Sequence, residues 1–163
     1  MQKKIYEASK KKNEFEMTRL QKILLSSNAA KLKAVRRVTQ DNLGKKTAGV
    51  DNVKYLEPKK RLELASSLFL DGKASSIRRV YIFQKKNEHR PLGIPTIKDR
   101  AKQFLALLAL EPQWEAQFEP NSYGFRPGRS CHDAIEAIFI AINQKPKYVL
   151  DADIQGCFNE INH

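Results

Sequence analysis

The sequence YVLDADIQGCFNEINH, residues 148–163, holds the most informative pattern in this chain of 163 residues. Residues 147–154 are rich in apolar side chains and predict a short buried strand that ends in acid. Asp151 and Asp153 are two positions apart, so they would project from the same face of that strand. A carboxylate followed by an exposed backbone carbonyl offers the hard oxygen ligands that Mg²⁺ prefers. The alternative is an ordinary strand end with solvated acids, and this pattern alone leaves both readings open.

The segment before this strand predicts a loop and a helix. Residues 120–129, PNSYGFRPGR, hold two prolines and two glycines, which is typical of a loop. Tyr123 and Phe125 could stack on bases or sugars while Arg126 and Arg129 meet backbone phosphates. The alternative is a structural loop whose aromatic rings plug into a core. Ser130 then predicts a helix cap, and the helix after it has one apolar stripe, formed by Ile135, Ile138, Phe139 and Ile142.

Further upstream, two short runs predict an antiparallel hairpin. Residues 78–84 (RRVYIFQ) and 89–95 (HRPLGIP) are β-branched and aromatic, and a polar turn separates them. We expect one face of the hairpin to pack while the other presents cations to phosphates. The alternative is a solvated edge protected by charge. The basic side chains concerned are Arg78, Arg79, Lys85, Lys86, His89 and Arg90.

The remaining periodicity is helical, so the sequence predicts an α+β chain. Residues 6–38 lack Pro and Gly and predict one or two amphipathic helices with a break near residues 26–28. Residues 41–53 predict a connecting loop, and residues 58–70 a second helical region that begins at a proline. Thr96 with Asp99 predicts the start of another helix, which Pro112 would end or kink.

The charge of the chain points to a polyanionic partner. The formal net charge is +12 and the sequence pI is about 9.8, far beyond what solubility requires. Residues 1–40 contribute +8 of this charge, and they include Lys33, Arg36 and Arg37, which we expect to bind RNA.

Composition favours nucleic acid over a membrane as that partner. No apolar run is long enough to span a bilayer, and the first residues lack the apolar core of a secretory signal. We therefore expect an intracellular protein, in a bacterial cytoplasm or in an organelle such as a plastid or mitochondrion. Cys131 and Cys157 are isolated and are expected to be reduced.

Four segments together resemble one family. RPLGIPTIKDR (90–100), LEPQWE (110–115), NSYGFRPGRSCHDAI (121–135) and residues 148–163 occur in the order and spacing of group II intron-encoded reverse transcriptases, also called maturases. TQDNLGKKTAGVDNV (39–53) looks like the N-terminal extension of that family. The resemblance implies a basic helical N-terminal extension over 1–75. A truncated reverse transcriptase domain over 76–163 would follow, with fingers and the first palm strand of an incomplete right-hand polymerase fold.

The resemblance also implies roles for single residues. Asp153 would be the catalytic aspartate of the first palm motif and would bind Mg²⁺ together with the backbone carbonyl of Ile154. Phe158 would lie under the sugar of the incoming nucleotide and favour dNTP over NTP. Arg90 and one of Lys85 or Lys86 would hold the nucleotide triphosphate or the template.

The sequence departs from the family pattern in several places. Gln155 stands where Lys is usual, Asn159 where Asp is usual, Phe83 where Pro is usual, and Lys102 where an apolar residue is more common. The family's second acidic motif, Tyr-x-Asp-Asp, does not occur in these 163 residues. Because transfer of a nucleotidyl group by two metals needs a second acidic cluster, we expect this polypeptide not to polymerise DNA alone.

Three interpretations of function follow from these expectations. The first is the N-terminal part of a group II intron RNA-directed DNA polymerase and maturase, which binds intron RNA and uses a template, a DNA primer and dNTP once a second polypeptide completes the palm. The second is a non-catalytic RNA-binding or splicing-assistance module from a split or degenerate copy. The third is a fragment of a retron-type reverse transcriptase.

Overall fold

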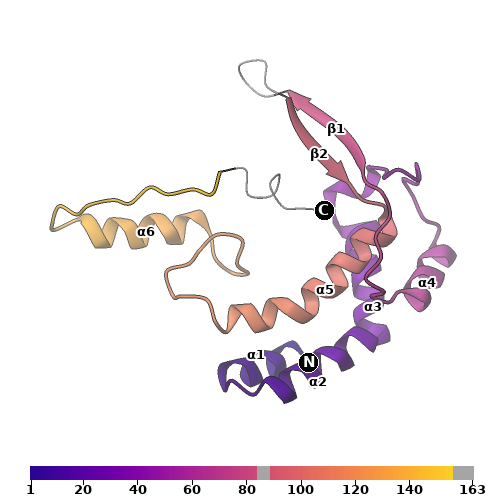
Figure 1. The fold of residues 1–163 in the computed structure, drawn as a ribbon, viewed down its shortest axis with the longest axis horizontal. Helices are drawn as coiled ribbons and strands as arrows, with labels where there is room; N and C mark the ends of the chain where they lie inside the picture. The colour runs from indigo at the N-terminus through magenta and orange to yellow at the C-terminus, as the bar shows by residue number, and fades with distance from the viewer. Residues whose placement is uncertain (84–88, 156–163) are drawn as a thin grey trace. The chain divides into compact units, whose positions relative to one another are not determined.

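The structure, a computed structural model, describes residues 1–83 and 89–155, and the chain divides into two compact units. Met1–Phe118 form the first unit and Glu119–His163 the second. Helices and one small antiparallel sheet make up the described residues, so the predicted α+β class is confirmed for them (Figure 1).

Helix α5 organises the first unit. It spans Ile97–Glu115, and its buried residues recur at helical spacing, among them Ile97, Ala101, Leu105 and Leu108. This confirms the predicted buried face. Pro112 lies inside the helix and is buried, and α5 does not end at this residue. An internal proline costs the helix one backbone hydrogen bond. The helix nevertheless continues to Glu115, because the buried contacts around Pro112 offset this loss.

Two hydrophobic clusters lie along α5. Near its start, Ile97, Ala101 and Leu105 pack with residues of α3 (Asn28–Arg36) and α4 (Pro58–Ser67). Near its end, Leu108 and Ala109 pack with residues of α1 (Gln2–Lys10) and α2 (Glu14–Ser26). Leu25, Ala30 and Phe104 border both clusters. The helices of the N-terminal region and α5 therefore share one continuous core.

The N-terminal helices have one break more than predicted. The break near residues 26–28 is confirmed, because Ser27 is extended between α2 and α3. A second break separates α1 from α2, where Lys12 has a φ of 54° and the Asn13 side chain accepts a hydrogen bond from Glu16 N at 3.1 Å. Asparagine is a preferred N-cap, so Asn13 starts a new helix in a run that has no proline or glycine.

The connection from α3 to α4 follows the prediction in outline. A π-helical turn, η1 (Arg37–Asp41), and a 3-10 turn, η2 (Leu43–Lys46), precede irregular chain up to Pro58. Helix α4 begins at the predicted proline but ends at Ser67, before the expected end at Leu70. The helix stops early because Leu68 takes an extended conformation that buries its side chain completely in the first cluster.

A two-stranded hairpin lies between α4 and α5. Strand β1 (Arg78–Phe83) pairs with β2 (His89–Ile94), which confirms the predicted hairpin. The turn residues 84–88 lie outside the described residues. The hairpin joins the N-terminal end of α5, and Gln2 and Ser9 of α1 bond to the carbonyls of Leu108 and Gln113 near the opposite end (Figure 1).

The second unit consists of a loop, helix α6 (Cys131–Ile142) and an irregular segment. The predicted loop over 120–129 is confirmed, and so is the helix start at Ser130, which forms a capping box with Asp133. The apolar stripe predicted on α6 is open to solvent, since no residue of this helix is buried. Cys131 is free and exposed, and Cys157 lies outside the described residues.

The strand predicted over 147–154 is wrong for the structure as described. Residues 146–154 form neither helix nor strand, and Leu150 is 90% exposed. A strand needs a neighbour to pair its backbone groups. The two strands within the described residues pair only with each other, so this segment has no partner strand there.

Candidate nucleic-acid interface

The hairpin carries its cations on both faces. Arg78 pairs with Ile94, Arg79 with Gly93, and Ile82 with Arg90. Because successive strand residues point to opposite faces, Arg78 and Arg90 share one face and Arg79 lies on the other. Every residue of β1 is exposed except Val80, which is half-buried. The prediction that one face packs while the other carries the cations is therefore wrong, since both faces carry arginines and both are largely exposed.

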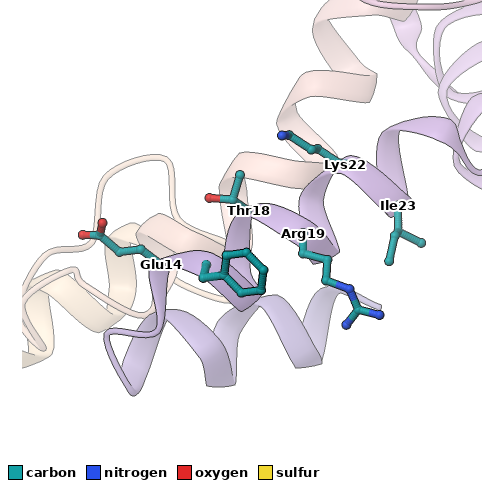
Figure 2. A pocket seen from close by; sticks show the side chains of 6 residues that line it. Glu14, Thr18, Arg19, Lys22 and Ile23 are labelled. Carbon is teal, nitrogen blue, oxygen red and sulfur yellow. The ribbon is translucent and has the colours of Figure 1, made fainter.

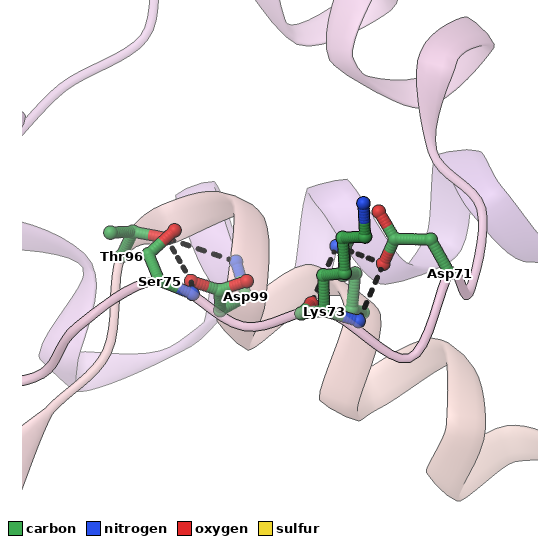
Figure 3. Close-up of polar contacts among 6 residues, drawn as sticks. Asp71, Lys73, Ser75, Thr96 and Asp99 are labelled. Carbon is green, nitrogen blue, oxygen red and sulfur yellow. Dashed lines mark hydrogen bonds and ion pairs between the residues drawn. The ribbon is translucent and has the colours of Figure 1, made fainter.

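Polar contacts fix the base of the hairpin to α5 (Figure 3). The Asp99 carboxylate accepts hydrogen bonds from the Thr96 hydroxyl at 2.7 Å and from Ser75 N at 3.1 Å. In return, the Thr96 hydroxyl oxygen accepts from Asp99 N at 3.1 Å, which caps α5 as predicted. Because Ser75 precedes β1 and Thr96 follows β2, this cluster ties both ends of the hairpin together.

A second contact lies one helical turn further along α5. Lys102 Nζ is 2.6 Å from Asp71 Oδ1 and donates to the carbonyl of Lys73 at 2.9 Å. Lys102 and Asp71 are both largely shielded from solvent, with side chains 12% and 24% exposed. Lys102 therefore fastens the segment that leads into β1 to α5.

The pKa values of the two carboxyls reflect these partners. The hydrogen bond from Lys102, with a smaller one from the backbone of Lys73, lowers the pKa of Asp71 from 3.8 to about 2. Burial alone would raise the pKa of Asp99, but the hydrogen bonds from Thr96 and Ser75 outweigh it, and the net shift is downward. Both carboxylates are thus charged at neutral pH and serve as anchors for the hairpin.

Helix α3 presents a row of cations at its C-terminal end. Lys33, Arg36 and Arg37 are exposed, and their spacing places them on one side of the helix. Arg36 Nε lies 3.5 Å from Asp41 Oδ1, but an exposed pair of this kind is weak and leaves the guanidinium open to a further anion.

A groove between α3 and α4 borders this row. Arg36 of α3 and Arg61 of α4 both line it, and its other walls are mostly apolar. Arg61 also lies over the Tyr55 ring, with its Cζ 5.2 Å from the ring centroid. No local pattern indicates that Arg61 would join the cations of α3, because their proximity depends on how two helices pack. The groove is lined by Leu32, Val35, Arg36, Gln40, Pro58, Arg61 and Leu62.

Helix α2 carries a shallow hollow of mixed charge on its outer surface (Figure 2). Arg19 and Lys22 line it, but so does Glu14, and Arg19 pairs with Glu16 at 3.1 Å. Phe15 also lines it and is largely exposed. Acids and cations alternate here, so this hollow is a weaker candidate for a polyanion than the row on α3.

In the second unit, Arg126 holds the predicted nucleic-acid loop together. It is buried, and its Nη1 donates to the carbonyls of Glu119 at 2.8 Å and Ser122 at 2.7 Å. The predicted contact of Arg126 with RNA stays a prediction, and these hydrogen bonds give the side chain a structural role within the loop. Arg129 is exposed and lies over the Tyr123 ring at 5.7 Å from its centroid. Phe125 is fully exposed, with a φ of 59° that is unusual for a bulky residue.

The predicted catalytic acid lies in the irregular segment. Asp153 is exposed, and its Oδ1 accepts a hydrogen bond from Ile154 N at 2.8 Å. Asp151 is exposed as well. Phe158, Lys85 and Lys86 lie outside the described residues, and Arg90 is exposed on β2. The catalytic, metal-binding and nucleotide-binding roles of these residues stay predictions.

The described residues supply only part of a metal site. Asp153 and the carbonyl of Ile154 offer oxygen ligands of the type that Mg²⁺ takes. A Mg²⁺ site usually contains further carboxylates or substrate phosphates as well. Across residues 1–83 and 89–155, no three His, Cys, Asp or Glu side chains cluster in a way that could hold a metal ion. The oxygen atoms of these two residues are therefore suitable ligands for Mg²⁺, but the described residues supply too few of them to form a complete site.

Comparison with known proteins identifies the family. The profile of the N-terminal domain of reverse transcriptase matches residues 1–68. The profile of reverse transcriptase (RNA-dependent DNA polymerase) matches residues 82–163, which is half of the chain. The chain belongs to the reverse transcriptase family. Within the described residues, no helix has the length and apolar character needed to cross a membrane.

Curated relatives confirm the predicted resemblance to group II intron-encoded reverse transcriptases. Group II intron-encoded protein LtrA of Lactococcus lactis subsp. cremoris is 42% identical over 53% of this chain and 14% of its own length. Maturase-like protein 1 of Euglena gracilis is 34% identical over 94% of this chain and 34% of its own. Protein YkfC of Escherichia coli K12 is 34% identical over 89% and 41%. The chain spans less than half the length of each of these relatives.

Proposed function

We propose that this chain is the RNA-binding N-terminal part of a group II intron reverse transcriptase and maturase. Residues 1–75 form its basic helical N-terminal extension, and residues 76–163 contain the fingers and the start of the palm of an incomplete right-hand fold. Its partners are intron RNA or an RNA template, and it works inside a bacterial cell or an organelle. The support comes from the family, from the net charge of +12 and from the exposed cations.

The observation that carries this proposal is the row of Lys33, Arg36 and Arg37 on α3. These side chains are exposed and lie on one side of the helix, whereas its apolar side is buried against α5 through Ala34 and Val35. A rigid helix face that presents three cations fits the spacing of phosphates on a folded RNA better than a flexible basic tail would.

The decisive experiment replaces charges and leaves the core intact. Deletion of residues 1–40 would remove Ile5, Leu24 and Val35 from the core and would unfold the first unit. We therefore propose the triple substitution Lys33→Gln/Arg36→Gln/Arg37→Gln in the full chain, with Lys145→Gln as a control at an exposed lysine of the second unit.

Binding to a folded RNA would be measured over a range of salt concentrations. The triple variant should bind more weakly, and the slope of log affinity against log salt should fall by about one for each phosphate that the variant no longer binds. The Lys145→Gln control should change neither quantity. A triple variant with unchanged affinity and slope would show that α3 does not bind the RNA.

In the completed enzyme, a Mg²⁺-dependent extension of a DNA primer with dNTP is the reaction that the family supports. Asp153 and the carbonyl of Ile154 would bind the metal, and Phe158 would contact the nucleotide sugar. Arg90 with Lys85 or Lys86 would contact its phosphates. Asp153→Asn, introduced into a polypeptide that also carries the rest of the reverse transcriptase domain, should abolish extension and spare RNA binding. Retained extension would exclude this metal assignment.

A second candidate is a non-catalytic RNA-binding or splicing-assistance module. The observation in its favour is that Asp153 has no second acid cluster beside it among the described residues. This function predicts that Asp153→Asn changes neither RNA binding nor splicing of the bound intron, whereas the triple substitution on α3 impairs both.

A further inference from the structure

The groove between α3 and α4 has mainly apolar walls. Leu32 and Val35 of α3 line it from one side, and Pro58 and Leu62 of α4 line it from the other. Its volume is about 320 Å³, and Leu32 and Leu62 are 45% and 62% exposed. Single exposed apolar residues are common on proteins, but a hollow that gathers several of them between polar groups indicates an interaction site.

The groove is built on the core of the first unit. Ala34 and Val35 of α3 and Ala65 of α4 are buried in the first hydrophobic cluster, together with Leu68 just after α4. The inner sides of the two helices are therefore fixed by packing, and the groove lies on their outer sides. A partner would find these walls already in place, which lowers the entropic cost of binding.

Each of the two helices contributes one arginine to the groove, Arg36 from α3 and Arg61 from α4. Arg61 Nε donates to the carbonyl of Leu56 at 2.7 Å, and its Cζ lies 5.2 Å from the centre of the Tyr55 ring, so both contacts orient the guanidinium. A guanidinium has five N–H donors, and this hydrogen bond uses one of them. The Arg36 side chain is 71% exposed, and its pair with Asp41 at 3.5 Å is weak. Both arginines can therefore bind a carboxylate of a partner.

The lining of the groove favours a protein over a nucleic acid as the partner. Unpaired bases bind proteins by stacking on aromatic rings, and none of the described residues that line the groove is aromatic. Aliphatic walls instead fit the apolar side chains of a protein. The backbone groups of α3 and α4 are bonded within each helix, so they offer no strand edge to an extended peptide, whereas a helix can lay its apolar side into the groove. Two arginines and no acid among the described lining residues favour a partner helix that carries acids.

We propose that the α3–α4 groove binds an acidic amphipathic helix of a partner protein. Apolar side chains one turn apart on that helix fill the space between Leu32 and Leu62, and carboxylates beside them pair with Arg36 and Arg61. This inference goes beyond RNA binding and does not depend on it, although Arg36 also belongs to the cation row of α3.

The test uses the full chain and a labelled helical peptide of about 15 residues, with leucines at i, i+3, i+4 and i+7 and glutamates beside them. A scrambled peptide of the same composition keeps the charge but has no apolar stripe. It therefore measures the unspecific attraction of an acidic peptide to a basic chain. Fluorescence anisotropy would give both affinities, and circular dichroism would confirm that each variant keeps the helical content of the wild type.

Two substitutions in the groove are compared with two matched controls. Leu62→Gln changes a wall without a change of charge, and its control is Leu107→Gln, at an exposed leucine of α5 that does not line the groove. Arg36→Gln removes a cation of the groove, and Arg19→Gln removes an exposed one from α2. Leu62→Gln should weaken binding of the helical peptide by about fivefold to thirtyfold and Arg36→Gln by about threefold to tenfold. Both controls should keep the wild-type affinity, and the scrambled peptide should bind every variant weakly.

Several outcomes would overturn this proposal. Equal affinity for the helical and scrambled peptides, no binding of either, or equal losses in Leu62→Gln and Leu107→Gln would exclude a helix-binding groove. Weaker binding of a folded RNA by Leu62→Gln, with unchanged binding of the peptide, would assign the groove to RNA. In sedimentation velocity, a wild-type dimer that Leu62→Gln dissociates would assign it to a second copy of the chain. The proposed RNA-binding function is tested separately, by the salt-dependent binding of folded RNA to the wild type.

Discussion

Lys102 and Asp71 form an ion pair, with 2.6 Å between Nζ and Oδ1, that joins the second turn of α5 to the segment leading into β1. This segment is otherwise irregular, and Ser75 is its other hydrogen-bonded link to α5 in the described residues, through Asp99. The direction in which the hairpin leaves the helical core therefore depends on two carboxylates and their partners.

The first prediction concerns the pH dependence of this ion pair. The pKa of Asp71 is about 2 in the folded chain, below its ordinary value of 3.8. A depressed pKa means that the charged carboxylate stabilises the fold above the unfolded value, and that this contribution is lost as the pH falls from 3.8 towards about 2. The stability advantage of the wild type over Asp71→Asn should thus be constant near neutral pH and vanish across that acidic range.

Urea denaturation at a series of pH values would measure this difference. Asp133→Asn is a suitable control, because the pKa of Asp133 is also lowered, chiefly by its hydrogen bond from Ser130, but this residue belongs to the second unit. An Asp71→Asn variant that parallels the wild type at every pH would show that the pair with Lys102 does not form in solution.

The second prediction concerns the cap of α5. Thr96→Ala removes both the hydroxyl that accepts from Asp99 N and the donor to the Asp99 carboxylate in a buried site. We expect the free energy of unfolding of the first unit to fall by about 1–2 kcal/mol. Ser130→Ala removes the same kind of cap from exposed helix α6, so it should leave the unfolding of the first unit unchanged. An equal effect of both substitutions on that transition would contradict the buried network.

Features that depend on residues close together in the sequence could be predicted, whereas features that depend on distant residues could not. The starts of α5 and α6 were predicted because Thr96 with Asp99 and Ser130 with Asp133 act across three residues. The hairpin was predicted because strand alternation is also local. The break at Asn13 was missed, because a single capping residue in an otherwise helical pattern carries little signal.

The site was harder to predict because it depends on contacts between distant segments. Ser75 and Asp99 are 24 residues apart, and Lys102 and Asp71 are 31 apart, so no local pattern could join them. The direction of the arginines on the hairpin required the register of β1 against β2. The predicted strand at Asp153 failed for a related reason, since strand formation requires pairing with a partner that a local pattern does not specify.

The third prediction concerns the loop around Arg126. Because its guanidinium ties the carbonyls of Glu119 and Ser122 together, Arg126→Met should loosen the loop and speed cleavage by chymotrypsin at Tyr123 and Phe125. Arg129→Met removes an exposed cation near Tyr123 but none of these backbone contacts, so it should leave the cleavage rate near that of the wild type. Mass spectrometry of the early fragments would locate the cuts. Unchanged cleavage of Arg126→Met would show that the loop does not need this buried arginine.

The fourth prediction concerns the close approach of two loops at Gly49. A Cβ at this position would lie 2.8 Å from Thr96 Cα and 2.9 Å from the carbonyl oxygen of Pro95, and backbone atoms cannot move aside as a flexible side chain can. Gly49→Ala should therefore push the chain after η2 away from the start of α5 and lower the free energy of unfolding by about 1–3 kcal/mol.

Gly44 provides the matched control, because it lies in the same connection and the nearest atom to its added Cβ is 3.9 Å away. Gly44→Ala should leave stability nearly unchanged when both variants are unfolded in urea. Since Gly49 touches the residues that cap α5, Gly49→Ala should also loosen the hairpin base and raise amide hydrogen exchange at Ser75, whose N–H is bonded to Asp99. A Gly49→Ala variant with wild-type stability and wild-type exchange at Ser75 would show that these two loops do not meet as closely as the structure indicates.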